Sequence, residues 1–185
     1  GGFDQTLLLV DGMKMDDVQT GHHTLNMILP LYLIERIEII KGPAARIFGQ
    51  NAFNGAINIV TKEFEGEKRT VNLNLNELSY GSFEQKNISL STKIVGEKIK
   101  SLISYSGNRS DGYRHNTDFK KNNYFIKTSF NSNNSPVDVI ASFTENKFGA
   151  NGFYASPSAT EQYEETQASL LGVTTTINSE KLSIT

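Results

Sequence analysis

A regular alternation of apolar and polar residues in strand-length segments fills the second half of this chain. The segments TVNLNLNEL, KNISLSTKI, NYFIKTSF and VDVIASF alternate at nearly every step, and KSLISYS and QASLLGVTTTI are further candidates. Because successive side chains of a strand point to opposite faces, each segment predicts a strand with one apolar and one polar face. After about Arg69 we therefore expect an antiparallel meander. Its apolar face should carry Val71, Leu73, Leu75, Ile88, Leu90 and Ile94, opposite asparagine and serine.

This pattern fits either the half-buried sheet of a soluble protein or the wall of a membrane barrel. Short links such as VGEK and NSNNSP alternate with the long segments GNRSDGYRHNTDFKK and KFGANGFYASPSATEQYEE, which favours the wall. Aromatic residues near the strand ends suit interfacial girdles, namely Tyr80, Phe83, Tyr105, Tyr124 and Phe143. The longest apolar run, MILPLYLI, has eight residues and a proline. It is too short for a membrane-spanning helix, which needs about 20.

Composition excludes several classes of function. Lysine and arginine total 18 against 20 aspartate and glutamate, whereas a nucleic-acid binder would usually show a basic stripe. The chain has no cysteine, so it has neither disulfides nor a cysteine nucleophile or metal site. A protein that crosses an oxidising periplasm is compatible with this composition.

The first 66 residues are more compact and mixed. We expect strands over Thr6–Val10, Glu35–Lys41 and Ala56–Thr61, with Asp11-Gly12 closing the first in a turn. One helical turn should begin at Pro43. IERIEIIKG carries charges on both faces, which indicates a strand set against polar surroundings.

LLLVDG and IERIEIIKGPAARIFGQNAFNGAINIVTK together resemble the C-terminal part of the plug domain of TonB-dependent outer-membrane receptors. The resemblance covers residues 6 to 62, and Lys41 stands where arginine is commoner in the family. FGANGFYASPSATEQYEET is similar to a segment of vitamin B12 receptor-like members, especially those of Bacteroidetes. The matching positions are Asp11, Gly12, Ile34 to Glu38, Lys41, Gly42, Pro43, Phe48, Gly49, Ala52, Gly55, Ile57, Asn58, Ile59 and Thr61.

The resemblance implies an α+β plug fragment over residues 1–66. Residues 67–185 would be the N-terminal strands of an antiparallel transmembrane β-barrel, about six or seven of roughly 22. It implies an active transporter of the outer membrane that binds a scarce nutrient and needs no cofactor. TonB would contact a segment preceding residue 1, and a surface lipoprotein is a further candidate partner beside the membrane lipid. Ion pairs and hydrogen bonds would dock the plug, so that it leaves without exposing an apolar core.

The resemblance to the vitamin B12 receptors also suggests the residues of the ligand site. Gln19, Thr20, Gly21, His22 and His23 would form a plug-apex loop that touches the ligand from below. Phe153, Tyr154 and Tyr163 would approach it from above and stack on a flat macrocycle. Cobalamin is the first substrate hypothesis and an iron chelate the second. Arg36, Glu38 and Lys41 would pair with the barrel wall.

Other interpretations of the same residues are weaker. Adjacent His22 and His23 point apart on a strand or loop, and His115 is the only further histidine, so we expect no metal site. The spacing from Gly42 to Gly49 does not fit a phosphate loop. No nucleophile–base set is recognisable, which argues against an enzyme such as a periplasmic hydrolase. A passive porin-like barrel or a soluble carbohydrate-binding β-module is the alternative function.

Overall fold

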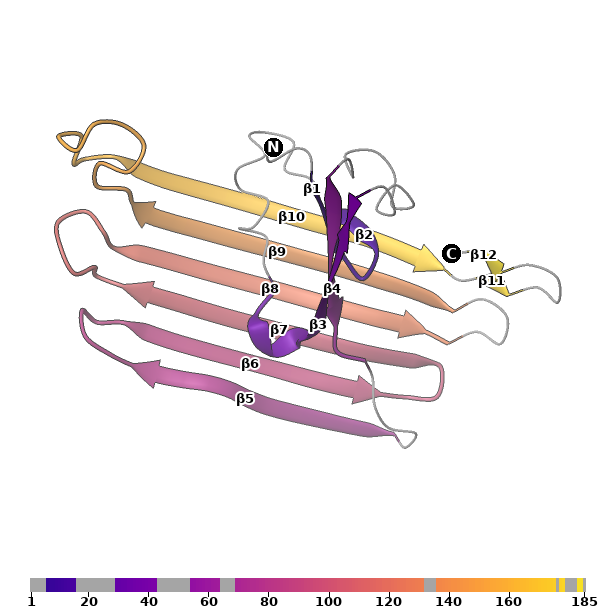
Figure 1. Ribbon diagram of the computed structural model, residues 1–185. Helices are drawn as coiled ribbons and strands as arrows, with labels where there is room; N and C mark the ends of the chain where they lie inside the picture. Colours follow the sequence, from indigo (N-terminus) through magenta and orange to yellow (C-terminus); the bar gives the residue numbers. More distant parts are fainter. Residues whose placement is uncertain are drawn as a thin grey trace.

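The structure, a computed structural model, consists of two sheets that pack against each other. It describes residues 6–15, 29–42, 54–63, 69–131, 136–175, 177–178 and 183–184. A four-stranded mixed sheet, here the small sheet, stands against one face of a six-stranded antiparallel sheet, here the long sheet. Figure 1 shows that the strands of the small sheet run across those of the long sheet. A short pair, Ile177–Asn178 (β11) with Ser183–Ile184 (β12), follows the long sheet.

The small sheet confirms the three strands predicted in the first part of the chain. Its strands are Thr6–Val10 (β1), Met13–Met15 (β2), Ile34–Lys41 (β3) and Gly55–Thr61 (β4), in the order β2-β1-β4-β3. β1 runs parallel to β4, and β3 runs antiparallel to it. The short strand β2 was not predicted. It pairs antiparallel with β1, and the two strands form a β-hairpin.

Asp11 and Gly12 form the two-residue turn of this hairpin. Val10 pairs with Met13, and the two turn residues have φ angles of +48° and +79°. Positive φ at both central positions is typical of a type I′ turn, which Asp-Gly adopts readily because glycine has no Cβ. The turn therefore holds the Asp11 side chain at the end of the small sheet.

Helical structure is sparse in the described part of the first 66 residues. A 3-10 helix, Leu31–Leu33 (η3), follows Pro30. The helical turn expected from Pro43 lies outside the described residues, as does the expected boundary at residue 66, so both stay predictions. Among the residues described, no helix is long and apolar enough to cross a membrane.

The long sheet is a meander of neighbouring strands, as the alternation predicted. Its connections alternate between short and long, so that residues 81–85, 111–118 and 150–162 all lie at one end, on the left in Figure 1. We call this the long-loop end. In order, the strands are Thr70–Tyr80 (β5), Lys86–Val95 (β6), Ile99–Ser110 (β7), Phe119–Phe130 (β8), Val137–Gly149 (β9) and Tyr163–Thr175 (β10).

The two faces of the long sheet differ as predicted. On β6, Ser89 and Ser91 are buried on the inward face, beneath the small sheet. Ile88 and Ile94 point outward and remain more than one third exposed. A bulge in β5 follows Leu75. β5 is exposed on both faces, but Val71 and Leu75 lie opposite Ile94 and Leu90 in register, so these residues share the outward face with Leu73.

The contact between the sheets is more apolar than the sequence suggested. Its core joins side chains of the small sheet and its helix to inward-facing side chains of the long sheet. The buried members are Val10, Met15, Leu29, Leu33, Ile59, Leu102, Phe125 and Ile140. The expectation of docking through ion pairs and hydrogen bonds alone is therefore wrong. On the inward face, Leu102 of β7, Phe125 of β8 and Ile140 of β9 are large and apolar. Packing against the small sheet removes these side chains from water.

Candidate functional site

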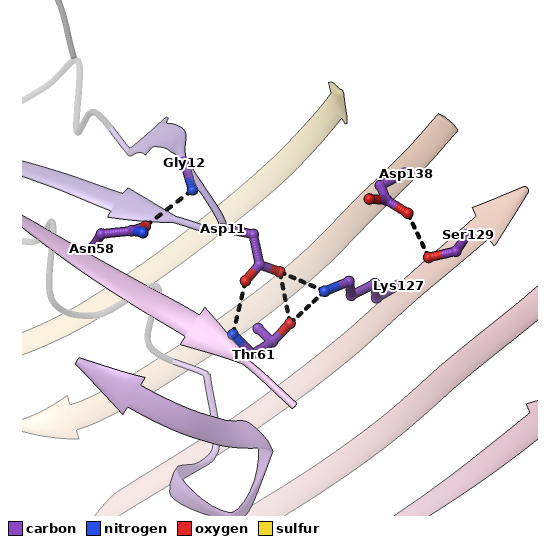
Figure 2. A network of polar contacts seen from close by, with 7 residues as sticks. All are labelled: Asp11, Gly12, Asn58, Thr61, Lys127, Ser129 and Asp138. Carbon is purple, nitrogen blue, oxygen red and sulfur yellow. Dashed lines mark hydrogen bonds and ion pairs between the residues drawn. The ribbon is translucent and has the colours of Figure 1, made fainter. Parts of the chain in front are cut away.

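A buried ion pair links the small sheet to the long sheet. The Lys127 Nζ of β8 lies 2.9 Å from Asp11 Oδ2, in the β1–β2 turn (Figure 2). Only 11% of the Lys127 side chain and 15% of the Asp11 side chain are exposed. At this burial the two charges are only weakly screened by solvent, so the pair matters more than a surface salt bridge.

Thr61, the last residue of β4, forms hydrogen bonds with both charged groups. Its backbone N–H donates to Asp11 Oδ1 over 2.8 Å, and its hydroxyl donates to Asp11 Oδ2 over 2.6 Å. The same hydroxyl accepts a bond from Lys127 Nζ at 2.8 Å. Thr61 itself is fully buried. Each carboxylate oxygen of Asp11 therefore has a donor, which offsets part of the cost of burying a charge.

The surroundings of Lys127 explain why this pair has to be satisfied. In register, Lys127 lies directly opposite Leu102 of β7 and Ile140 of β9, and both are buried apolar residues. A lysine that lost its carboxylate here would be left charged among hydrocarbon side chains. Breaking such a pair from one side typically costs about 3–5 kcal/mol.

A hydrogen-bonded chain continues from the Asp11–Gly12 turn across the small sheet. Asn58 Oδ1 accepts from Gly12 N over 3.0 Å, and Asn58 Nδ2 donates to Glu38 Oε2 over 2.9 Å. Arg36 Nε donates to the other Glu38 oxygen over 2.8 Å. The bonds from Asn58 and Arg36 lower the pKa of the Glu38 carboxyl. The turn that carries Asp11 is thus held by β4, which in turn is bonded to β3.

The expected wall pairing of Arg36, Glu38 and Lys41 takes a different form in the described residues. Arg36 pairs with Glu35 and Glu38 on its own strand, and both pairs are substantially exposed. Between the described residues of the small and long sheets, the ion pair is that of Asp11 with Lys127. Pairing of Arg36, Glu38 and Lys41 with a barrel wall stays a prediction.

A second polar contact joins the sheets beside the ion pair. The hydroxyl of Tyr32, in η3, is hydrogen-bonded to the hydroxyl of Ser104 on β7. Ser104 is buried, and Tyr32 packs at the edge of the apolar core. The Asp11–Lys127 and Tyr32–Ser104 contacts therefore both join the first part of the chain to the long sheet, next to the apolar core.

The long-loop end forms a separate polar cluster. The Asn116 side-chain amide donates to the Thr160 carbonyl over 2.7 Å and to the Gln162 carbonyl over 2.6 Å. His115 Nε2 lies 2.7 Å from Glu161 Oε1 in an exposed contact, which is an ion pair when His115 is protonated. The connections 111–118 and 150–162 are thereby joined into one surface, although they come from different hairpins.

Two of the three aromatic residues predicted to contact ligand lie on this surface. Phe153 and Tyr154 form an edge-to-face pair with ring centroids 4.8 Å apart, and both are at least half exposed. Burial of the hydroxyl and the nearby Glu164 carboxylate raise the pKa of Tyr154 to about 12, so it stays a neutral phenol. Tyr163 pairs with Gly149 at the start of β10, in the outward-facing row, so it does not join them.

The other predicted ligand residues, Gln19, Thr20, Gly21, His22 and His23, lie outside the described residues. Among the residues described, no group of three His, Cys, Asp or Glu side chains could hold a metal ion. Sequence reasoning missed Asp11, Thr61 and Lys127 as a set. The available signal was a lone lysine among neutral residues on the inward face of NYFIKTSF.

Comparisons with known proteins agree with this geometry. Residues 1–56 match the family model of the TonB-dependent receptor plug domain. The vitamin B12 transporter BtuB of Vibrio vulnificus (strain YJ016) is 34% identical over 113 residues, 60% of this chain and 18% of that protein. An iron-regulated outer membrane virulence protein of Vibrio cholerae (strain ATCC 39541 / Classical Ogawa 395 / O395) is 38% identical over 68 residues. This match covers 34% of this chain and 10% of that protein.

Solved structures with a similar fold are also receptors and transporters. The crystal structure of the siderophore receptor PirA from Pseudomonas aeruginosa superposes with a TM-score of 0.68. The match covers 98% of this chain and 31% of that one, and at 19% identity it concerns the fold alone. The chain spans less than a fifth of the BtuB relative.

These relatives are transporters and receptors, which argues against an enzyme. The sequence relatives come from Vibrio, so the particular resemblance to Bacteroidetes members is not supported. The outer membrane is the location that they indicate for this protein. Residues 1–56 are therefore similar to the plug domain of TonB-dependent receptors, and 60% of the chain is similar in sequence to part of a vitamin B12 transporter.

Proposed function

We propose that the chain is part of an active transporter for a scarce nutrient. Residues 1–66 would be the C-terminal part of its plug, and residues 67–185 the first strands of its barrel. The observation that carries the proposal is the docking of the small sheet on the inward face of the long sheet through Asp11, Thr61 and Lys127. A sheet held in this way blocks the space in front of a wall and can be released as a unit.

The composition of the contact supports release under force. Separating the two sheets exposes a limited apolar patch, but it also returns Asp11 and Lys127 to water, which solvates both charges. In the proposed cycle TonB pulls on a segment that precedes residue 1, and the inner-membrane proton gradient supplies the energy. The small sheet moves, the ligand passes, and the ion pair re-forms.

The ligand would lie between the plug apex and the long-loop end. Gln19 to His23 would contact it from the plug, while Phe153 and Tyr154 would offer an exposed aromatic surface. Such a surface can stack on a flat macrocycle, so cobalamin is the first candidate and a metal chelate the second. The B12 transporter and the siderophore receptor among the relatives support both candidates. Outer-membrane lipid would surround the outward face, and a surface lipoprotein could cover the loops.

The alternative functions differ in what they leave unexplained. A passive porin-like barrel has no use for a sheet docked on its inner wall. A soluble carbohydrate-binding module would not expose an outward face as apolar as Val71, Leu73 and Leu171, each more than 70% exposed. Both alternatives also lack a reason for the plug-domain match over residues 1–56.

Uptake by cells that carry the full-length receptor tests the proposal. Labelled cyanocobalamin and a ferric chelate are supplied separately, with TonB present or deleted. We expect uptake of one of them that disappears without TonB. Uptake that continues unchanged in the deletion strain would favour the passive barrel.

Substitutions in the same cells test the ligand surface. His22→Ala with His23→Ala, and Phe153→Ala with Tyr154→Ala, should each weaken ligand affinity and uptake at unchanged surface expression. Phe83→Ala, in the connection 81–85, is the aromatic control and should have no effect. Wild-type affinity in both double variants would show that these residues do not contact the ligand. It would not contradict the proposal that the protein is a transporter.

A further inference from the structure

A row of aromatic rings crosses the outward face of the long sheet. Tyr105 and Tyr124 lie with ring centroids 5.1 Å apart, and Tyr124 and Phe143 6.3 Å apart. Away from the long-loop end, the rows next to them are apolar, with Ile103, Ile126, Ala141 and Leu171 in register. Toward the long-loop end the next row is polar on β8 and β9, with Asn122 and Glu145, but apolar on β5 and β6, with Leu78 and Ile88. Because tyrosine suits a boundary between apolar and wet surroundings, this row marks the edge of the apolar band.

A groove of about 610 Å³ lies on the outward face of β5 to β8, beginning at this edge. Its floor is apolar and includes Leu78, Ile88 and Tyr105. Gly107 allows the Tyr105 side chain to lie across the floor, since a Cβ there would lie 2.6 Å from the Tyr105 hydroxyl oxygen. The floor is thus continuous with the apolar band, and the groove reaches past it toward the long-loop end.

The rim of the groove is cationic. Lys86, Arg109 and Lys120 line it, and no carboxylate is among the lining residues. Lys86 is paired with Glu84 over 2.8 Å. Arg109 also acts on the Glu84 carboxylate through its charge. Asp111 acts through its charge on Tyr80, which also lines the groove, so the three basic side chains lie near two carboxylates, Glu84 and Asp111.

The arrangement of Arg109 and Lys120 is unfavourable without a counter-charge. They lie directly opposite each other on β7 and β8, and Lys120 lies opposite Lys147 on β9. Like charges directly opposite in a sheet destabilise it. Lys147 forms ion pairs with Glu165 at 3.2 Å and with Glu145 at 3.7 Å. Among the described residues, no ion pair joins Arg109 or Lys120 to a carboxylate.

We propose that this groove binds a phosphate-bearing lipid of the membrane leaflet next to the long-loop end. An acyl chain lies along Leu78, Ile88 and Tyr105, and the phosphate lies between Arg109 and Lys120. The guanidinium of Arg109 can donate two parallel hydrogen bonds to phosphate oxygens. The occupant is a lipid because a soluble phosphate would leave the apolar floor uncovered.

The full-length receptor in mixed micelles is the system for the test. The probes are phosphatidic acid and the diacylglycerol with the same acyl chains, which differs only by the phosphate. Binding is followed by native mass spectrometry. The variant Arg109→Gln with Lys120→Gln is compared with Lys98→Gln and Lys100→Gln, which remove the same charge near the opposite end of the sheet.

Wild-type receptor should retain phosphatidic acid in preference to diacylglycerol. The Arg109/Lys120 double variant should bind phosphatidic acid about tenfold more weakly, since each basic side chain near an anionic lipid contributes measurably. The Lys98/Lys100 control should bind as the wild type does. Heat-dependent migration of the barrel on a gel should be unchanged in both variants.

Three outcomes would overturn the proposal. Equal retention of the two lipids would show that the phosphate is not recognised. Equal losses in the two double variants would show a general effect of net charge. Displacement of phosphatidic acid by an equal concentration of inorganic phosphate would show an anion site without a lipid. None of these results depends on which nutrient the receptor transports.

Discussion

The contact between the two sheets and the long-loop end both use an ion pair, in opposite surroundings. Asp11 and Lys127 meet between two packed layers, with side chains 15% and 11% exposed. His115 and Glu161 meet at a loop surface, with side chains 66% and 78% exposed. Water solvates the second pair almost as well apart as together, so separation there is nearly free. In the first pair each charge depends on the other for its stability.

The difference shows how one chain can combine a firm attachment with an adaptable surface. The buried pair holds two strands from sheets far apart in sequence, so it reports on whether the small sheet is in place. The loop pair is accompanied by backbone hydrogen bonds from Asn116, which hold the connections together whatever the ionisation of His115. Three experiments test how strongly each of these contacts stabilises the protein, and another tests the two faces of the long sheet.

Replacing Lys127 with methionine should have the largest effect. Asp11 would remain buried without its cation, and we expect the free energy of unfolding of the full-length receptor to fall by about 3–5 kcal/mol. Urea denaturation followed by protease protection of the small sheet measures it. Lys100→Met, near the start of β7 in the same sheet, should change little. The double variant Asp11→Asn with Lys127→Met should recover most of the loss, because asparagine tolerates the φ of +48° and can still accept a hydrogen bond from Thr61. A double variant as unstable as Lys127→Met alone would contradict a stabilising role of the ion pair.

The outward face should tolerate charge less than the inward face. We expect Leu73→Arg to reduce assembly into the outer membrane, because a lipid-facing arginine costs about 2–4 kcal/mol at the bilayer midplane. Asn74→Arg, the next residue on the same exposed strand, faces the other way and should assemble. Folded receptor is counted by surface labelling. Equal assembly of the two variants would contradict the assignment of the lipid-facing and inward faces.

At the long-loop end, the effect of Asn116→Ala should be smaller. It removes the donors to Thr160 and Gln162 and places alanine at a φ of +51°, so we expect a local loss of about 1–3 kcal/mol. Hydrogen exchange in the connection 150–162 measures it. Asn116→Gly separates the two causes, since glycine tolerates the backbone but cannot donate. Unchanged protection in both variants would show that the bonds to Asn116 do not hold the loops.

The weakest effect concerns the His115–Glu161 pair. Hydrogen bonds from His115 and Thr160 lower the pKa of Glu161 below its ordinary value of 4.5. A lowered carboxyl pKa contributes stability above the unfolded pKa and loses it as pH falls through the folded pKa. The contribution of the Glu161 carboxylate to the loop contact should therefore be lost in acid, as the pH falls below 4.5. His115→Ala should raise the Glu161 pKa in an NMR titration, and an unchanged titration would show that the pair is not formed in solution.

Local pattern was enough to predict most strands and both faces of the long sheet. Alternation of period two defines a strand, and the choice of residues on each face defines where it points. β6 follows this rule from Ile88 to Ile94, whereas β8 departs from it at Phe125, an apolar residue buried on the inward face. β2 was missed because three residues are too few to show a period.

The partner of Lys127 could not be predicted in the same way. Lys127 and Asp11 are separated by 116 positions, and the alternation says only that Lys127 faces inward. Tyr163 was predicted to contact ligand from the resemblance, and only the register of β10 shows that it lies in the outward row. Its contact with ligand stays a prediction.

The sequence by itself therefore determined the strands, the faces, the Asp-Gly turn and the relationship to a receptor family, because each depends on neighbouring residues. Only the tertiary structure decided which charges meet, which inward positions are apolar, and how the two long connections join. Those depend on how one sheet lies on another. Burial and pairing are properties of the assembled layers, and no local pattern records them.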